Sequence, residues 1–202
     1  MSEMRQRIFL SAAIILSASS LMSPAHAQSM VDRCVNKQSA YTPAQQISAC
    51  TEAIASGRWS GSGVAWAYTN RCIGYKDKGE YDRAIEDCNR SIDLDPRDQF
   101  AYNSRGAAYY FKKDYDQSIA DYNQASRINP RFIDPVHNAG LSYAAKGDYD
   151  TAIALYNKAL RIDPRDATAL YGRGVAKQHL GDEDGGDADI AAAREIDPNI
   201  GK

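Results

Sequence analysis

The chain has 202 residues, of which 44% are hydrophobic and 25% are charged. This is the composition of an ordinary globular protein, and it excludes a largely disordered chain. The formal net charge of −2 gives no reason to expect a nucleic acid or an anionic membrane as a partner.

The first 27 residues have the three parts of an export signal in the usual order. Two arginines stand near the start, residues 8–16 are apolar, and Ala25-His26-Ala27 is a small-x-small cleavage site. The apolar run is shorter than the roughly 20 residues that span a bilayer. We therefore expect a signal peptide at 1–27 that is cleaved after Ala27, giving a bacterial periplasmic or secreted protein with no membrane insertion. The alternative is an uncleaved amphipathic anchor.

Four cysteines follow in two pairs, Cys34 with Cys50 and Cys72 with Cys88, and the spacing is the same in both pairs. A zinc ribbon or a thioredoxin-like motif has little support, because the chain has no Cys-x-x-Cys pair. In an oxidising compartment, equally spaced cysteines of even number predict disulfides. The spacing fits one cysteine on each helix of a hairpin, so we predict the bonds Cys34–Cys50 and Cys72–Cys88. Four cysteines allow three pairings, and the alternative is that some of them are small buried core residues.

Residues 28–63 are predicted to form an irregular helical hairpin and a connector. Thr42 is a suitable cap for the second helix of this hairpin, and Pro43 suits its first turn. The segment WSGSG at 59–63 is the only flexible-looking connection of the mature chain. A domain boundary is expected there, with a repeat domain at 64–202.

From position 64 onward, the same residue kinds return at a constant interval. An Asp-Pro or Asn-Pro pair ends each copy, at 95–96, 129–130, 163–164 and 197–198. The four copies span about 65–98, 99–132, 133–166 and 167–200. Small residues recur at places that let helices approach closely, among them Cys72, Gly106, Gly140 and Gly174.

The copy at 133–166 is predicted to form two helices and a turn. Apolar residues recur at helical spacing on both sides of Lys146-Gly147-Asp148. Gly147 can take a left-handed conformation that ends the first helix, and Asp148 places negative charge at the start of the second. Pro164 ends the second helix, because a residue before proline is pushed out of the helical region.

A helix–turn–helix repeat of this length, about 34 residues, resembles the tetratricopeptide repeat family. The segments NRCIGYKDKGEYDRAIEDCNRSIDLDP, NSRGAAYYFKKDYDQSIADYNQASRINP and NAGLSYAAKGDYDTAIALYNKALRIDP carry the resemblance, which covers about residues 65–198. It implies an all-α fold of tandem helix–turn–helix repeats stacked as a right-handed α-solenoid. The last copy keeps the spacing but weakens the sequence, so we expect it to be the C-terminal cap and the hairpin at 28–63 to be the N-terminal cap.

The resemblance also implies a concave groove, lined by the first helix of each repeat, in which family members bind an extended peptide or a helix of another protein. Carried onto this chain, the main groove residues are Trp66, Thr69, Asn70, Ile73, Phe100, Asn103, Ala107, Tyr110, Phe111, His137, Asn138, Leu141 and Tyr171. Further groove-facing places are Lys76, Ser104, Ala145, Val175, Gln178 and His179. This set combines amides that can hold a peptide backbone with aromatic rings that can anchor a side chain.

One departure from the family matters for the ligand. Members that grip a C-terminal carboxylate use lysine and arginine at the places that Thr69, Asn103 and His137 occupy here. A carboxylate clamp for chaperone tails is therefore not expected.

Two alternatives stay open for the groove residues. The aromatic residues at 100, 110 and 111 could belong in part to the core between repeats. The asparagines at 70, 103 and 138 could bond only to neighbouring backbone. Three arginines that recur at one place in the repeat are predicted to be structural, namely Arg71, Arg105 and Arg173.

The sequence therefore predicts a non-enzymatic scaffold for protein–protein interaction. No catalytic residue, cofactor or metal site is expected, because the chain has no nucleophile elbow, phosphate-binding loop or metal-ligand cluster. The expected partner is a protein or peptide of unknown identity. The alternative is a structural protein of the cell envelope that associates with itself through the alanine-rich segment 188–193.

Overall fold

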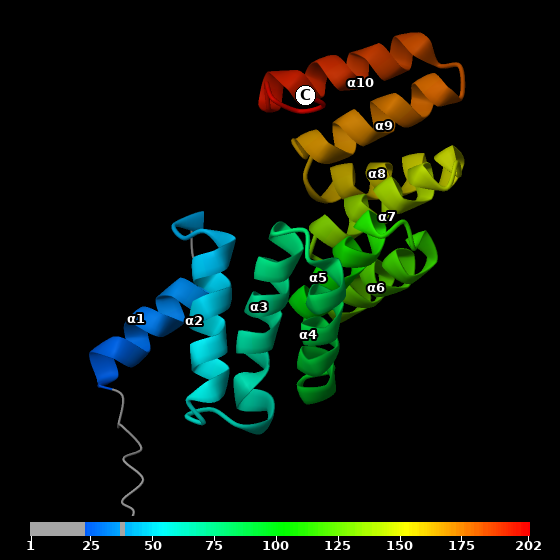
Figure 1. The fold of residues 1–202 in the computed structure, drawn as a ribbon. Coiled ribbons are helices and arrows are strands. Elements are labelled where there is room, and N and C mark those ends of the chain that lie inside the picture. The colour runs from blue at the N-terminus through cyan, green and yellow to red at the C-terminus, as the bar shows by residue number, and fades with distance from the viewer. Residues whose placement is uncertain (1–22, 37–38) are drawn as a thin grey trace, which may run out of the picture.

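Helices make up the described part of the chain, residues 23–36 and 39–202 of this computed structural model (Figure 1). The elements are α1 (Pro24–Val35), α2 (Pro43–Ala55), the 3-10 helix η2 (Gly61–Val64), α3 (Ala65–Asp77), α4 (Tyr81–Leu94), α5 (Gln99–Phe111), α6 (Tyr115–Ile128), α7 (Asp134–Ala145), α8 (Tyr149–Ile162), α9 (Ala167–His179) and α10 (Glu183–Ile196). Those two ranges contain no strand. The predicted all-α fold of stacked helix–turn–helix repeats is confirmed.

The helix starts follow from local capping. Thr42 Oγ1 accepts a hydrogen bond from the Gln45 N–H, and the Gln45 side chain accepts one from the Thr42 N–H, which is a capping box. The second helices α6, α8 and α10 each begin at an aspartate whose carboxylate accepts the N–H three residues later. These starts are encoded by residues within one turn of each helix.

Each turn between the two helices of a repeat contains one residue with positive φ. Glycine fills this place in three repeats, with φ of 81° at Gly79, 85° at Gly147 and 89° at Gly181. In the second repeat the place is taken by Lys113, with φ of 64°. A residue with a Cβ is disfavoured in this left-handed region, whereas glycine is not.

Replacing Lys113 by glycine is expected to raise the free energy of unfolding by about 0.5 kcal/mol. The change removes a left-handed penalty of about 1–2 kcal/mol but gives the unfolded chain more freedom, which offsets part of the gain. Urea denaturation measures the difference. Lys113→Ala is the control and should bring no gain, and a glycine variant that is less stable than the native protein would contradict the prediction.

Consecutive helices pack against one another along the whole stack, from α1 on α2 to α9 on α10. The first helices of successive repeats, α3, α5, α7 and α9, also contact each other. Figure 1 shows α2 and α3 upright and α9 and α10 lying nearly across them at the other end. The helix direction therefore turns along the stack.

A small residue faces a large one inside each of the two middle repeats. A Cβ at Gly106 would lie 3.0 Å from the Tyr122 ring, and a Cβ at Gly140 would lie 2.8 Å from the Tyr156 ring. In the first full repeat, Cys72 and Cys88 occupy the same two places. A disulfide thus stands where these later repeats have a glycine–tyrosine contact.

Both cysteine pairs are joined as the spacing predicts. The S–S distances are 2.06 Å for Cys34–Cys50 and 2.04 Å for Cys72–Cys88, and all four side chains are fully buried. Each bond lies within one hairpin, so each constrains only its own part of the stack.

Replacing Cys72 and Cys88 by alanine is expected to lower the free energy of unfolding by about 3 kcal/mol, because the unfolded chain is no longer cross-linked. Hydrogen exchange should become faster across α3 and α4 and their neighbours. Helices α7 to α10 contain no cysteine and serve as the internal control. Equal changes in exchange along the whole chain would count against this local role.

Only the start of the connector at 59–63 is packed against a helix, because Trp59 is half-buried whereas residues 60–63 are exposed. The Trp59 ring meets the Trp66 ring edge-on, with centroids 5.3 Å apart. The Gln46 side chain donates to the Asn70 carbonyl oxygen at 3.0 Å. The N-terminal hairpin therefore packs directly on α3, and the boundary at 63 stays a prediction.

Most of the predicted signal peptide, residues 1–22, lies outside the described residues. The expected cleavage site falls in the first turn of α1, where Ser23 accepts the His26 N–H and His26 Nε2 lies 2.5 Å from Glu52 Oε1. Cleavage after Ala27 would remove this cap and this contact. In the ranges 23–36 and 39–202, no helix has both the length and the apolar character needed to cross a membrane.

Candidate binding groove

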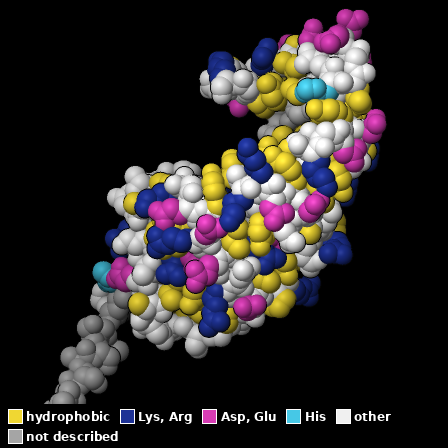
Figure 2. All heavy atoms as spheres, turned by 45° about the vertical axis from the view of Figure 1, so that its right-hand side comes forward, with side chains coloured by type: hydrophobic (Ala, Val, Ile, Leu, Met, Phe, Trp, Pro, Cys, Tyr) yellow, Lys and Arg dark blue, Asp and Glu magenta, His cyan; other side chains and the backbone are white. Residues whose placement is uncertain are grey.

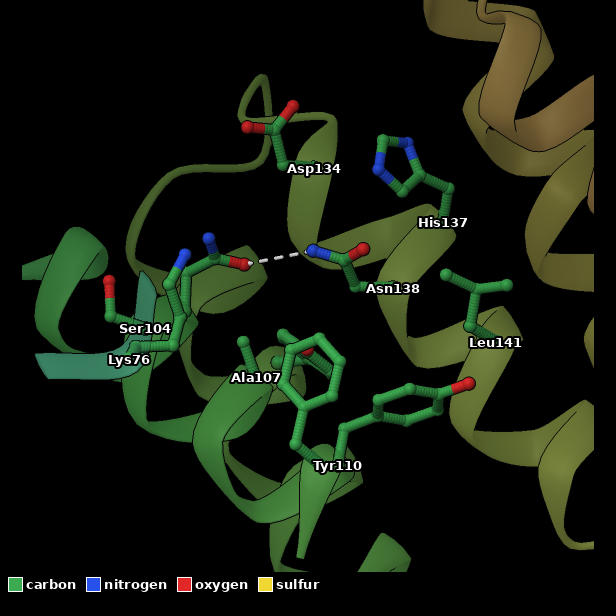
Figure 3. A pocket seen from close by; sticks show the side chains of 11 residues that line it. Lys76, Ser104, Ala107, Tyr110, Asp134, His137, Asn138 and Leu141 are labelled. Atoms are coloured by element: carbon green, nitrogen blue, oxygen red, sulfur yellow. Dashed lines mark hydrogen bonds between the residues drawn. The ribbon is translucent and has the colours of Figure 1, made fainter. Parts of the chain in front are cut away.

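A cavity of about 340 Å³ opens between α5 and α7. These two first helices supply most of its lining residues, and α3 and α6 supply one each. The lining residues are Lys76, Asn103, Ser104, Ala107, Tyr110, Phe111, Tyr122, Asp134, His137, Asn138 and Leu141. Seven of the main predicted groove residues are thus brought together. Figure 3 labels five of them, namely Ala107, Tyr110, His137, Asn138 and Leu141.

An amide pair lies across the cavity. Asn138 Nδ2 donates to Asn103 Oδ1 at 3.4 Å, and both side chains are half-buried (Figure 3). The contact leaves the amide nitrogen of Asn103 and the amide oxygen of Asn138 without a bond to another described residue. The pair can therefore offer a donor and an acceptor to the N–H and C=O of one residue of an extended peptide.

Apolar side chains form part of the cavity wall. Ala107, Leu141 and the Phe111 ring line it, and Phe111 is 55% exposed. Burial, together with the nearby Tyr115, raises the pKa of Tyr110, so its phenol stays neutral at ordinary pH. The cavity thus has a polar centre and an aromatic side.

Six of the main predicted groove residues do not line this cavity: Trp66, Thr69, Asn70, Ile73, Phe100 and Tyr171. Thr69 is only 4% exposed, and its hydroxyl donates to Asp98 Oδ2 at 2.5 Å. Asn70 donates to the Trp66 carbonyl oxygen at 2.7 Å, which is the structural role left open for it. Both side chains are therefore engaged within the fold.

Phe100 and Tyr171 differ from each other in exposure. Phe100 is 52% exposed and meets the Phe132 ring at 5.3 Å, so it is a surface residue rather than core. Tyr171 lies against the chain near Gly201, where an added Cβ would come within 2.6 Å of its ring. The C-terminal residues thus cover part of Tyr171.

His137 is both a cavity residue and a partner of the next repeat. Its Nδ1 lies 2.7 Å from Asp166 Oδ2, and both side chains are largely buried. The second oxygen of Asp166 accepts the Ala169 N–H and caps α9. This contact ties the groove wall to the following helix.

Acidification is expected to weaken this contact. Burial opposes ionisation of Asp166, but hydrogen bonds from His137 and from the backbone of Ala169 and Thr168 outweigh it, so the pKa of Asp166 lies below its ordinary value. The stabilisation is therefore complete above about pH 4 and is lost as the pH falls through the lower pKa of the folded state. Stability from urea unfolding should fall more steeply with acid in the native protein than in Asp166→Asn, which cannot ionise. Parallel pH profiles would rule the linkage out.

The three recurring arginines are structural, as predicted. Each donates through Nε and Nη2 to both oxygens of an aspartate on the second helix of its own repeat, in the pairs Arg71–Asp87, Arg105–Asp121 and Arg173–Asp189. The Nη1 atoms of these arginines reach Thr51, Asn89 and Asn157, which belong to the preceding hairpins. None of the three arginines lines the cavity.

Sequence reasoning missed two cavity residues, Tyr122 and Asp134. Asp134 stands one repeat after Phe100 and two repeats after Trp66, so the repeat spacing itself could have identified it. Tyr122 belongs to a second helix and lies against Gly106. No periodic signal marks a second-helix residue as part of a groove lined by first helices.

Comparison with known families settles the class of repeat. Residues 65–98 and 100–132 match a model of the tetratricopeptide repeat, and residues 140–181 match a further model of the TPR repeat. The chain belongs to the tetratricopeptide repeat (TPR) family. The matched segments begin at α3 and continue to the end of α9, and they contain most of the cavity residues. Asp134, His137 and Asn138 fall between two of the matches.

Solved structures agree on the fold. TTC0263, described as a thermophilic TPR protein in Thermus thermophilus, superposes with a TM-score of 0.72 at 19% identity, over 86% of this chain and 93% of that protein. A crystal structure of MamA gives a TM-score of 0.67 at 22% identity, over 85% of this chain and 92% of that one. At such identities the likeness shows the fold alone. No curated protein sequence matches this chain significantly.

Proposed function

We propose that this TPR protein is a non-enzymatic scaffold outside the bacterial cytoplasm, and that it binds a short segment of another protein between α5 and α7. The observation that carries the proposal is the amide pair Asn103–Asn138 at the centre of the cavity, with apolar side chains beside it. An extended peptide has one N–H and one C=O per residue, and this pair can bond to both.

The cavity walls suit a segment of mixed character. Ala107, Leu141 and Phe111 can contact an apolar side chain, while Lys76 and Asp134 add one charge of each sign. The volume of about 340 Å³ lies at the lower end of the range for ligand pockets, so only one or two side chains are buried at once.

The proposed location rests on the cysteines. Two disulfides within buried helix interfaces are typical of proteins in an oxidising compartment. The export pattern at the N-terminus supports the same location.

The test is a crosslinking pull-down from the periplasmic fraction with the mature protein and two variants. The groove variant changes Asn103, Phe111 and Asn138 to alanine. The matched control changes Asn123 and Lys158, which lie on the second helices α6 and α8, to alanine. Circular dichroism and urea unfolding establish that both variants are folded.

We expect the native protein and the control to capture the same partner and the groove variant to lose it. If the folded groove variant captures the same partner, this groove is not the binding surface. If all three proteins crosslink only to themselves, the self-associating structural protein replaces the scaffold.

A further inference from the structure

A tyrosine begins the second helix in three repeats, at Tyr81, Tyr115 and Tyr149. In two of them, a ring from the end of the next first helix lies flat on the tyrosine ring. Phe111 stacks on Tyr81 with centroids 5.2 Å apart and planes 9° apart, and His179 stacks on Tyr149 at 4.4 Å and 7°. Two neighbouring repeats are thus joined by a stacked pair of rings at each of these places.

No ring of a described residue is stacked in this way on Tyr115. The equivalent place is Ala145, whose side chain is a single, exposed methyl group. The aromatic neighbour of Tyr115 among the described residues is Tyr110 of the same repeat, at 5.7 Å with the planes tilted by 55°. That ring meets Tyr115 at an angle and does not stack on it.

The missing ring is not explained by a different arrangement of the helices. Lys112, next to Phe111, forms an ion pair with Asp82. Lys146, next to Ala145, forms the same ion pair with Asp116, one repeat later. The two interfaces therefore share this ion pair and differ in the side chain at 111 or 145.

Tyr115 adjoins the groove, although neither Tyr115 nor Ala145 lines the cavity itself. Tyr110, which contacts Tyr115, lines the cavity, and so does Leu141, one turn before Ala145 on α7. Figure 3 shows Tyr110 and Leu141 on the same side of the cavity, away from Asp134. A segment bound at the amide pair can thus reach Tyr115 with a neighbouring side chain.

We propose that an aromatic side chain of the partner segment binds between Tyr115 and Ala145. It would stack on Tyr115 as the Phe111 ring stacks on Tyr81 and the His179 ring on Tyr149. This subsite rests on the proposed function, and it adds the chemistry of the anchor. The chain itself shows the occupant, because two of its three equivalent places are filled by a ring stacked on tyrosine.

The subsite can be tested before the partner is known. The probes are N-acetyl-phenylalaninamide and N-acetyl-leucinamide, followed by NMR on the Tyr115 ring and the Ala145 methyl group. The variant Ala145→Phe is designed to place the chain's own ring over Tyr115. The equivalent position one repeat earlier holds Phe111, whose ring stacks on Tyr81. Tyr149 and His179 already stack, so their resonances are the internal control.

We expect the phenylalanine probe to shift the Tyr115 and Ala145 resonances of the native protein and to leave the control pair unchanged. The leucine probe should shift them less, and neither probe should shift Tyr115 in Ala145→Phe. Equal shifts by both probes, or equal shifts in the variant, would overturn the aromatic subsite.

A pull-down with Ala145→Phe separates this proposal from the proposed function. Capture of the partner should fall about tenfold if its aromatic anchor is displaced. If the groove variant loses the partner but Ala145→Phe captures it fully, the scaffold stands and the subsite is wrong. If the phenylalanine probe binds at Tyr115 but the groove variant keeps the partner, the subsite stands and the proposed function falls.

Discussion

Changing Arg105 to alanine is expected to lower the free energy of unfolding by about 3–5 kcal/mol. The guanidinium donates to Asp121 at 2.7 and 2.8 Å and to Asn89 of the preceding repeat at 2.5 Å. Asp121 is buried, so the substitution leaves a carboxylate in the helix interface without its cation. Chemical denaturation of the folded variant measures the loss.

The third repeat provides the matched control for this experiment. It has Ala139 and Leu155 where the other repeats have the arginine and the aspartate. The double variant Arg105→Ala, Asp121→Leu copies that pair, and replacing both charges by apolar groups is often nearly neutral. We expect it to recover most of the lost stability. A single variant within about 1 kcal/mol of the native protein, or a double variant that is no better than the single one, would contradict this account.

Changing Tyr156 to alanine is expected to cost about 3–5 kcal/mol as well, because it removes a large side chain that is fully buried. The ring lies between two first helices, and a Cβ added at Gly140 or Gly172 would lie 2.8 or 2.5 Å from it. The neighbouring helices meet it through glycine, so no side chain there can expand to fill the cavity.

Changing Tyr156 to phenylalanine should behave differently. The Tyr156 hydroxyl is buried and has no hydrogen-bond partner among the described residues, and burial raises the pKa of Tyr156, so the phenol stays neutral. Removing this oxygen is expected to leave stability unchanged or to raise it by about 1 kcal/mol. Urea unfolding of the two variants side by side distinguishes the contribution of the ring to stability from that of the hydroxyl. A phenylalanine variant as unstable as the alanine variant would show that the hydroxyl is bonded in solution.

The sequence by itself determined the elements of this protein and their order. No tertiary contact is needed to predict the repeat period, the capping residues such as Thr42 and Asp148, or the turn at Gly147. Caps and turns act through bonds within one helical turn. The cysteine pairing could also be predicted, because the spacing of each pair spans one hairpin. The contact between the Trp59 and Trp66 rings could not be predicted, since it depends on how the chain before α3 packs against that helix.

Only the tertiary structure decided which groove side chains keep a hydrogen-bonding group available for a partner. Thr69, Asn103 and His137 occupy the same place in three successive repeats. Thr69 bonds to Asp98, and His137 bonds to Asp166. The residue that corresponds to these two aspartates in the repeat of Asn103 is Phe132. The Phe132 side chain accepts no conventional hydrogen bond, so the amide nitrogen of Asn103 stays available in the cavity. The deciding residue lies at the start of the next repeat, and helical periodicity does not connect the two. Local rules fix a helix within a few residues, but the availability of a side chain depends on what the next helix brings beside it.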